Sequence, residues 1–134
     1  MESPESKNEW FDVENEIALL FDADQNEPIR KGLVNSDEAM QTRDEDRLIR
    51  AKQILKAYQE KVFELSGQDL WKLGCIFQHG RVAENYKIAF ELAQQAIDKG
   101  YVEATDLLHA AEDRFLLETT EKQKWGTQTL EEGE

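Results

Sequence analysis

Apolar side chains recur every three or four residues along most of this chain, which is the spacing of one face of an α-helix. The pattern predicts five helices, over residues 8–24, 42–65, 66–78, 84–99 and 102–119. No segment of useful length alternates apolar and polar residues as a strand would. We therefore expect an all-α fold, a single-domain bundle of about five helices over residues 8–128, with a flexible N-terminus at 1–7 and a flexible acidic tail at 129–134.

Local signals predict where the central helices begin and end. Thr42 and Glu45 match a capping box, in which the hydroxyl accepts from a free amide and the carboxylate reaches back to the cap. The second helix should therefore begin at Thr42. Ser66-Gly67 should end it, and Ser66 with Asp69 should cap the third helix.

Small and aromatic residues punctuate the segment from 73 to 104 at the intervals of an antiparallel helical hairpin. They are Leu73-Gly74, Phe77, Gly80, Ala89, Ala96, Gly100 and Ala104. Small residues let two helices approach closely, with Gly80 in the turn and Gly100 as a left-handed residue after the second helix. The spacing resembles the SEL-one-like repeat, a relative of the tetratricopeptide repeat. This resemblance implies a helical binding surface rather than a reaction.

Four polar motifs give a second resemblance, which covers residues 24–128. They are Asp24-Gln25, Phe77-Gln78-His79-Gly80, Glu112-Asp113-Arg114-Phe115-Leu116 and Gly126-Thr127-Gln128. In this order they resemble a family of small, mostly bacterial helical proteins known as a domain of unknown function. Trp125 stands where that family commonly has Tyr or Phe. The resemblance implies kinship and brings no particular activity.

The net charge of the chain excludes some classes of binding partner. The net charge is −13 and the isoelectric point is about 4.6, so the chain lacks the basic face that nucleic-acid phosphates require. Residues 1–27 carry nine carboxylates and one lysine, either as a solvated face or as a docking surface for a basic partner. We find neither a signal peptide nor an apolar stretch near the roughly 20 residues of a membrane span. A cytoplasmic protein without a membrane or nucleic-acid partner is therefore expected.

The polar motifs supply the candidate site residues. These are Gln78, His79, Asp113, Arg114, Thr127 and Gln128. A compact bundle can gather them, with Arg114 binding a carboxylate or phosphate and His79 acting as general acid or base. Alternatively, Arg114 ties the tail to the bundle through carbonyls around Gly126, paired with Asp113 or another carboxylate, while His79 caps the end of its helix. In either case we expect the tail to be ordered through Gln128, with Trp125 contributing buried apolar surface.

The sequence gives no signal for a metal or another cofactor. Cys75 is the single cysteine, which excludes an intrachain disulfide, and its apolar neighbours indicate an inert buried thiol. We favour a helical binding or interaction module whose partner is a protein or a small molecule. The alternative is a small hydrolase or transferase with its site around His79 and Arg114. An open pocket containing both side chains would favour a ligand-binding protein or an enzyme, and a closed, satisfied network would favour a structural role.

Overall fold

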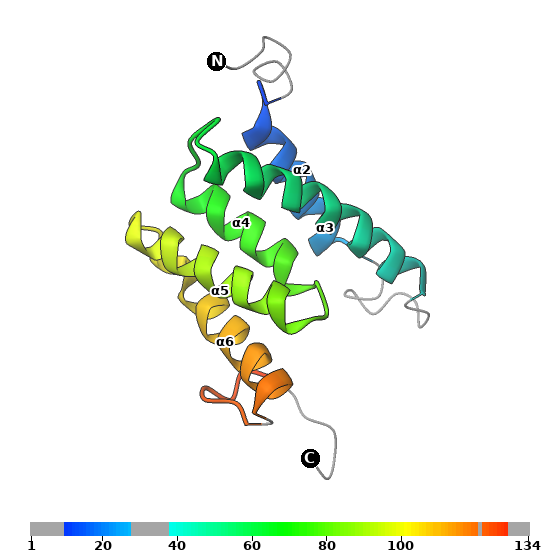
Figure 1. Ribbon diagram of the computed structural model, residues 1–134, viewed down its shortest axis with the longest axis vertical. Helices are drawn as coiled ribbons and strands as arrows, with labels where there is room; N and C mark the ends of the chain where they lie inside the picture. Colours follow the sequence, from blue (N-terminus) through cyan, green and yellow to red (C-terminus); the bar gives the residue numbers. More distant parts are fainter. Residues whose placement is uncertain (1–9, 28–37, 121, 129–134) are drawn as a thin grey trace.

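The computed structural model describes residues 10–27, 38–120 and 122–128. Within these segments the chain forms α2 (Val13–Gln25), α3 (Glu38–Gln59), α4 (Gly67–Gln78), α5 (Ala83–Asp98), the short 3-10 helix η1 (Val102–Ala104) and α6 (Thr105–Thr119) (Figure 1). The same segments contain no strand, so the predicted all-α fold class is confirmed. The two ends predicted to be flexible, 1–7 and 129–134, lie outside the described residues.

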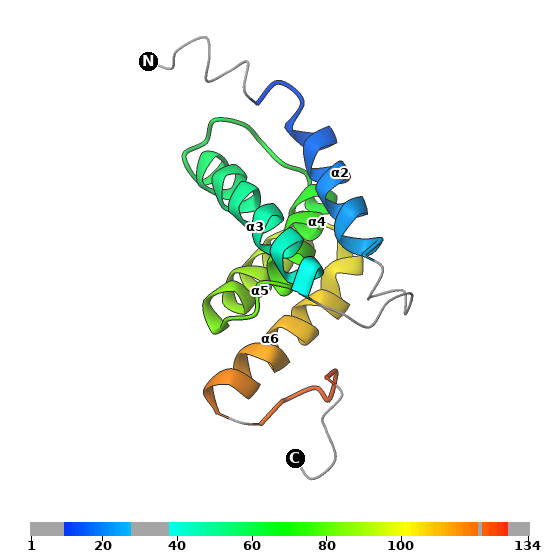
Figure 2. The ribbon, with the colours of Figure 1, turned by 90° about the vertical axis from the view of Figure 1, so that its right-hand side faces the viewer.

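The antiparallel pair α4 and α5 forms the centre of the bundle. α6 packs mainly on α5, whereas α2 and α3 both pack on α4 (Figures 1 and 2). The two sides of the hairpin are therefore covered by different elements. None of the described helices is both long enough and apolar enough to span a membrane.

Close approach of α4 to its neighbours depends on Gly74. A Cβ atom at this position would lie 2.9 Å from Cδ2 of Leu107 and 3.5 Å from the carbonyl oxygen of Ala89. Leu73 and Phe77 are completely buried beside it. The small residue therefore brings α4, α5 and α6 together over one core, as the spacing from 73 to 104 predicts.

The predicted start of the second helix was wrong. α3 begins at Glu38, so Thr42 lies inside the helix and cannot cap it. The preceding residues Glu38-Ala39-Met40-Gln41 are all strong helix formers, and ion pairs from Arg43 and Arg47 to Glu27 hold this end of α3. Intrinsic propensity and tertiary contacts therefore outweigh the capping signal.

The predicted end of this helix at Ser66 was also wrong, because α3 ends at Gln59. Lys61 adopts a left-handed conformation with φ of 63°, and the amide of Val62 donates to the carbonyl of Ala57. This is a Schellman motif, which usually has glycine at the left-handed position. A lysine there gives no visible stop signal. The capping box of α4 is as predicted, with the amide of Asp69 3.1 Å from Oγ of Ser66.

The two turn glycines serve different purposes. Gly100 has φ of 93° and ends α5 in a Schellman motif, with the amide of Tyr101 donating to the carbonyl of Ala96. At Gly80 the constraint is space, since a Cβ there would lie 2.4 Å from Nδ2 of Asn85. The left-handed residue of that turn is Arg81, with φ of 65°.

Replacing Gly100 by valine should lower the free energy of unfolding by about 1 kcal/mol or more, because a β-branched residue is strained at positive φ. No atom lies within 4 Å of the added Cβ, so steric overlap does not contribute. Urea unfolding measures the effect, and Gly100→Asn is the control, since asparagine tolerates this conformation better. Equal stability of Gly100→Val and the parent protein would contradict the assignment.

Candidate functional site

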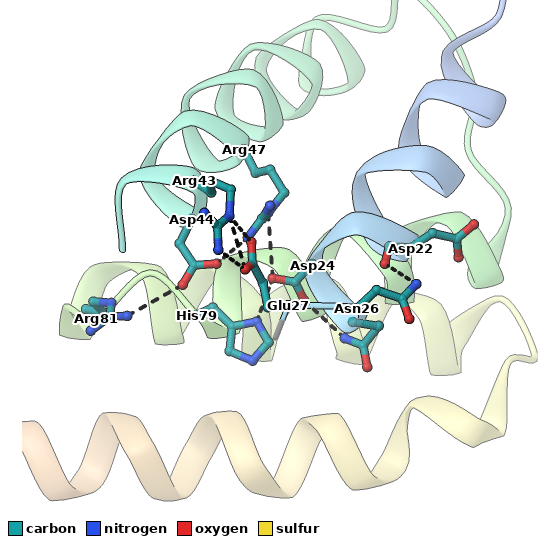
Figure 3. A network of polar contacts seen from close by, with 10 residues as sticks. Asp22, Asp24, Asn26, Glu27, Arg43, Asp44, Arg47, His79 and Arg81 are labelled. Carbon is teal, nitrogen blue, oxygen red and sulfur yellow. Dashed lines mark hydrogen bonds and ion pairs between the residues drawn. The ribbon is translucent and has the colours of Figure 1, made fainter. Parts of the chain in front are cut away.

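A cluster of ionised side chains joins the end of α2 to the start of α3 (Figure 3). Glu27 is 2% exposed and accepts hydrogen bonds from Nη2 of Arg43 at 2.6 Å and from Nη2 of Arg47 at 2.7 Å. The same Arg47 nitrogen donates to Oδ1 of Asp44 at 2.6 Å. Because 43 and 47 are one helical turn apart, both guanidinium groups reach the same carboxylate.

The pKa of Glu27 reports how strongly this cluster holds the charged carboxylate. The hydrogen bonds from Arg43 are the largest cause, and with those from Arg47 they lower the pKa of Glu27 from 4.5 to about 2. Burial acts in the opposite direction but is outweighed. Glu27 is therefore a charged anchor between α2 and α3.

Asp24 connects this cluster to α4. Its carboxylate is 1% exposed, and Oδ1 lies 2.9 Å from Nδ1 of His79, the residue that follows α4. Nε of Arg47 lies 4.0 Å from the same oxygen, and Nε2 of Gln25 donates to the other oxygen at 3.1 Å. The aspartate thus fixes the orientation of the imidazole ring.

A pocket of about 360 Å³ opens beside this imidazole. Met40, Asp44, His79, Arg81 and Arg114 line it, and we call it the His79 pocket. A neighbouring hollow of about 300 Å³ shares Asp44, His79 and Arg81. Nη2 of Arg81 lies 3.6 Å from Oδ2 of Asp44, and Figure 3 shows this aspartate between Arg81 and Arg47. The pocket therefore lies where α3, the α4–α5 turn and α6 meet.

Arg114 joins the pocket to the C-terminal tail. Its Nη1 donates to the carbonyl oxygen of Gln78 at 2.6 Å, and its Nε donates to Oε1 of Gln128 at 2.8 Å. The guanidinium also lies 5.8 Å from the ring centre of Tyr86. Arg114 thus binds the tail as the structural interpretation expected, but through a side chain and not through the carbonyls around Gly126.

Asp113, the next residue toward the helix N-terminus, binds the tail backbone directly. It is fully buried and accepts from the amides of Lys124, Trp125 and Thr127 at 2.7, 2.7 and 2.9 Å, and from Oγ1 of Thr127 at 2.7 Å. Burial alone would raise the pKa of Asp113, but the hydrogen bonds from Thr127 and the two other amides together lower it. We call this arrangement the Asp113 latch.

Trp125 contributes less buried surface than predicted, since it is 46% exposed. Its indole stacks on His109 with ring centres 3.9 Å apart, and Nε1 donates to Oε1 of Glu112 at 2.5 Å. Hydrogen bonds to Asp113 therefore hold the tail together with the stacked indole.

The six candidate residues divide into groups. His79 and Arg114 line the pocket, Asp113 and Thr127 form the latch, and Gln128 links the two through Arg114. Gln78 is 6% exposed, and neither polar atom of its side chain has a hydrogen-bond partner.

Sequence reasoning did not select the other pocket residues. Met40, Asp44 and Arg81 were missed, and Asp24 was noted only as part of a family resemblance. The spacing of Arg43, Asp44 and Arg47 on one helix face was the available signal.

Other possible reactive groups give no further site. Within residues 10–27, 38–120 and 122–128, no three His, Cys, Asp or Glu side chains gather as metal ligands would. Burial raises the pKa of the Cys75 thiol to about 12, which keeps it protonated and unreactive.

Neither a family model, nor a curated protein, nor a solved structure matches this chain. The two resemblances drawn from the sequence therefore stay predictions.

The variant Glu27→Gln should lower the free energy of unfolding at pH 7 by about 1–3 kcal/mol, because two guanidinium groups lose their charged acceptor. The folded-state pKa of Glu27 is depressed, so its contribution is complete above pH 4.5 and disappears as the pH falls toward 2. Urea unfolding across this range should show the two proteins converging. A stability difference that is unchanged between pH 7 and pH 2 would contradict this role.

The variant Asp113→Asn should lower the free energy of unfolding by about 1–3 kcal/mol and release the tail, because an amide cannot accept all four hydrogen bonds. Amide exchange at Lys124, Trp125 and Thr127 should accelerate. Glu112→Gln is the control, since within residues 122–128 Glu112 binds the side chains of Trp125 and Lys124 and not the backbone amides. Slow exchange at these amides in Asp113→Asn would show that the latch does not hold the tail.

Proposed function

We propose that this protein is a binding module for a small anion, which Arg81, Arg114 and His79 hold in the His79 pocket. The observation that carries the proposal is the pocket itself, which contains both His79 and Arg114. Its volume of about 360 Å³ falls within the range of small-molecule sites. A purely structural role would instead favour a closed arrangement of these side chains.

The charges around the pocket favour an anion. Two guanidinium groups and an imidazole face one carboxylate, Asp44, which already interacts with Arg47 and Arg81. Arginine binds carboxylate and phosphate groups through paired N–H donors. The chain as a whole has a net charge of −13, so positive side chains gathered around one pocket are unusual in it. Binding of an anion would explain them.

The backbone at Arg81 supports the same conclusion. A φ of 65° is unfavourable for arginine, and such strain persists where the surrounding structure requires it, often at ligand sites. Here the conformation accompanies a guanidinium on the pocket wall and its contact with Asp44. Glycine would satisfy the backbone better but would provide no charge.

The sequence motifs also support a shared site. The residues quoted for the family resemblance come from distant parts of the chain and meet in pairs here. Asp24 contacts His79, and Arg114 joins Gln78 to Gln128. We propose that the family resemblance reflects this site. We also propose that the protein is cytoplasmic, as the sequence predicts.

A small enzyme is the second candidate, and the contact between Asp24 and His79 favours it. A carboxylate bound to Nδ1 orients an imidazole whose other nitrogen can accept a proton from a reacting group. The hydrolase or transferase proposed from the sequence would use His79 in this way. Binding is the first candidate because the pocket supports it without a reaction step.

Inorganic phosphate and propionate test the proposal as the simplest anions of the two chemical types. Each should raise the melting temperature and bind in isothermal titration calorimetry, because a ligand of the folded state alone stabilises it. Arg81→Gly should weaken binding by about tenfold or more while leaving stability near that of the parent protein, since glycine removes the strain and the charge together.

Lys61→Gly is the matched control. Lys61 has nearly the same φ, 63°, but follows the far end of α3, about 33 Å along the helix from its start. It should bind both anions as the parent protein does. Failure of both anions to bind the parent protein, or unchanged binding by Arg81→Gly, would overturn the proposal.

A further inference from the structure

We infer that the ligand of the His79 pocket carries a hydrogen-bond donor next to its negative charge, as an α-hydroxy carboxylate does. This inference rests on the proposed function, because it names the class of anion that the same pocket takes. The preference depends on which ring nitrogen of His79 carries the hydrogen.

Asp24 determines which ring nitrogen of His79 carries the hydrogen. A carboxylate can only accept hydrogen bonds, and Oδ1 of Asp24 lies 2.9 Å from Nδ1. Nε2 of Gln25 donates to the other oxygen, and the Arg47 guanidinium forms an ion pair with the carboxylate, which keeps the carboxylate an acceptor. Nδ1 therefore carries the hydrogen in the neutral ring, and Nε2 carries a lone pair.

Nε2 is the ring atom available to a ligand. Among the described residues, Asp24 is the one polar partner of the His79 ring, through Nδ1, and the side chain is 23% exposed while lining the pocket. Figure 3 shows the ring between the charged cluster and α6. The pocket wall at His79 is thus an acceptor when the ring is neutral.

The charged groups around the ring come from every element that meets here. α2 contributes Asp24, α3 contributes Asp44 and Arg47, the α4–α5 turn contributes Arg81, and α6 contributes Arg114. The arginines can only donate, so they suit the charged end of a ligand. Asp44 is held between Arg47 and Arg81.

The acceptor at Nε2 of His79 and the donors of the arginines together distinguish a simple carboxylate from a hydroxylated one. A plain carboxylate bound to Arg81 and Arg114 would place an oxygen lone pair against Nε2 unless the ring takes up a proton. An α-hydroxy carboxylate avoids this conflict, because its hydroxyl donates to Nε2 while its carboxylate accepts from the arginines. The neutral imidazole thus selects for the hydroxyl group.

Lactate and propionate isolate this effect, since the two anions differ only by the hydroxyl group. In isothermal titration calorimetry at pH 8, lactate should bind about fivefold more tightly than propionate, or better.

The control is His109→Gln, which removes the other histidine of the chain. It should keep the preference for lactate. Nitrogen-15 NMR of the His79 ring provides an independent measurement, and the hydrogen should be on Nδ1 in the neutral form. Its presence on Nε2 would overturn the inference.

The outcomes separate this inference from the proposed function. Equal binding of lactate and propionate would overturn the hydroxyl preference and leave an anion site. Absence of binding by lactate, propionate and inorganic phosphate alike would overturn the anion site itself. A preference for lactate that disappears in His109→Gln would place the hydroxyl group elsewhere and contradict the role of His79.

Discussion

The pocket depends on a buried carboxylate that three helices share. Asp24, in the last turn of α2, holds the imidazole that follows α4, and Arg47 of α3 lies beside the same oxygen. A buried charge is costly unless it is paired. Separating α2 from α3 and α4 would therefore leave the Asp24 carboxylate without its charged partners. The contact therefore fixes His79 relative to Met40 and Asp44 on α3, and the pocket lies between them.

The other wall depends on a second buried carboxylate. Asp113 satisfies three backbone amides of the tail, and Arg114 beside it reaches both the end of α4 and Gln128. Neighbouring residues of α6 thus hold the tail against the bundle, through Asp113, and place a guanidinium at the pocket, through Arg114. A structural role and a binding role are compatible here, because Arg114 makes these contacts and also lines the pocket.

Helical periodicity was enough to predict the fold class, and small residues predicted the close packing at Gly74. Local signals failed where the structure uses an unusual residue or a distant partner. Lys61 occupies a position typical of glycine, and α3 begins before its apparent cap. Such features depend on contacts that no short segment contains.

The candidate site was predictable only in part for the same reason. His79 and Arg114 stood out by residue type and motif, but their partners lie far away in the sequence. Asp24 is 55 residues from His79, and the carbonyl of Gln78 is 36 residues from Arg114. The position of Arg81 at the pocket could not be predicted, since it depends on a left-handed backbone conformation that the sequence does not specify.

The location of a bound anion is the central claim, and NMR titration tests it most directly. On addition of lactate, the side-chain Nε–H signals of Arg81 and Arg114 and the ring signals of His79 should shift together, with one common dissociation constant. The amide of Lys61 should stay unchanged. Shifts confined to other basic residues, such as Lys87 or Lys99, would place the anion outside the pocket and contradict the account.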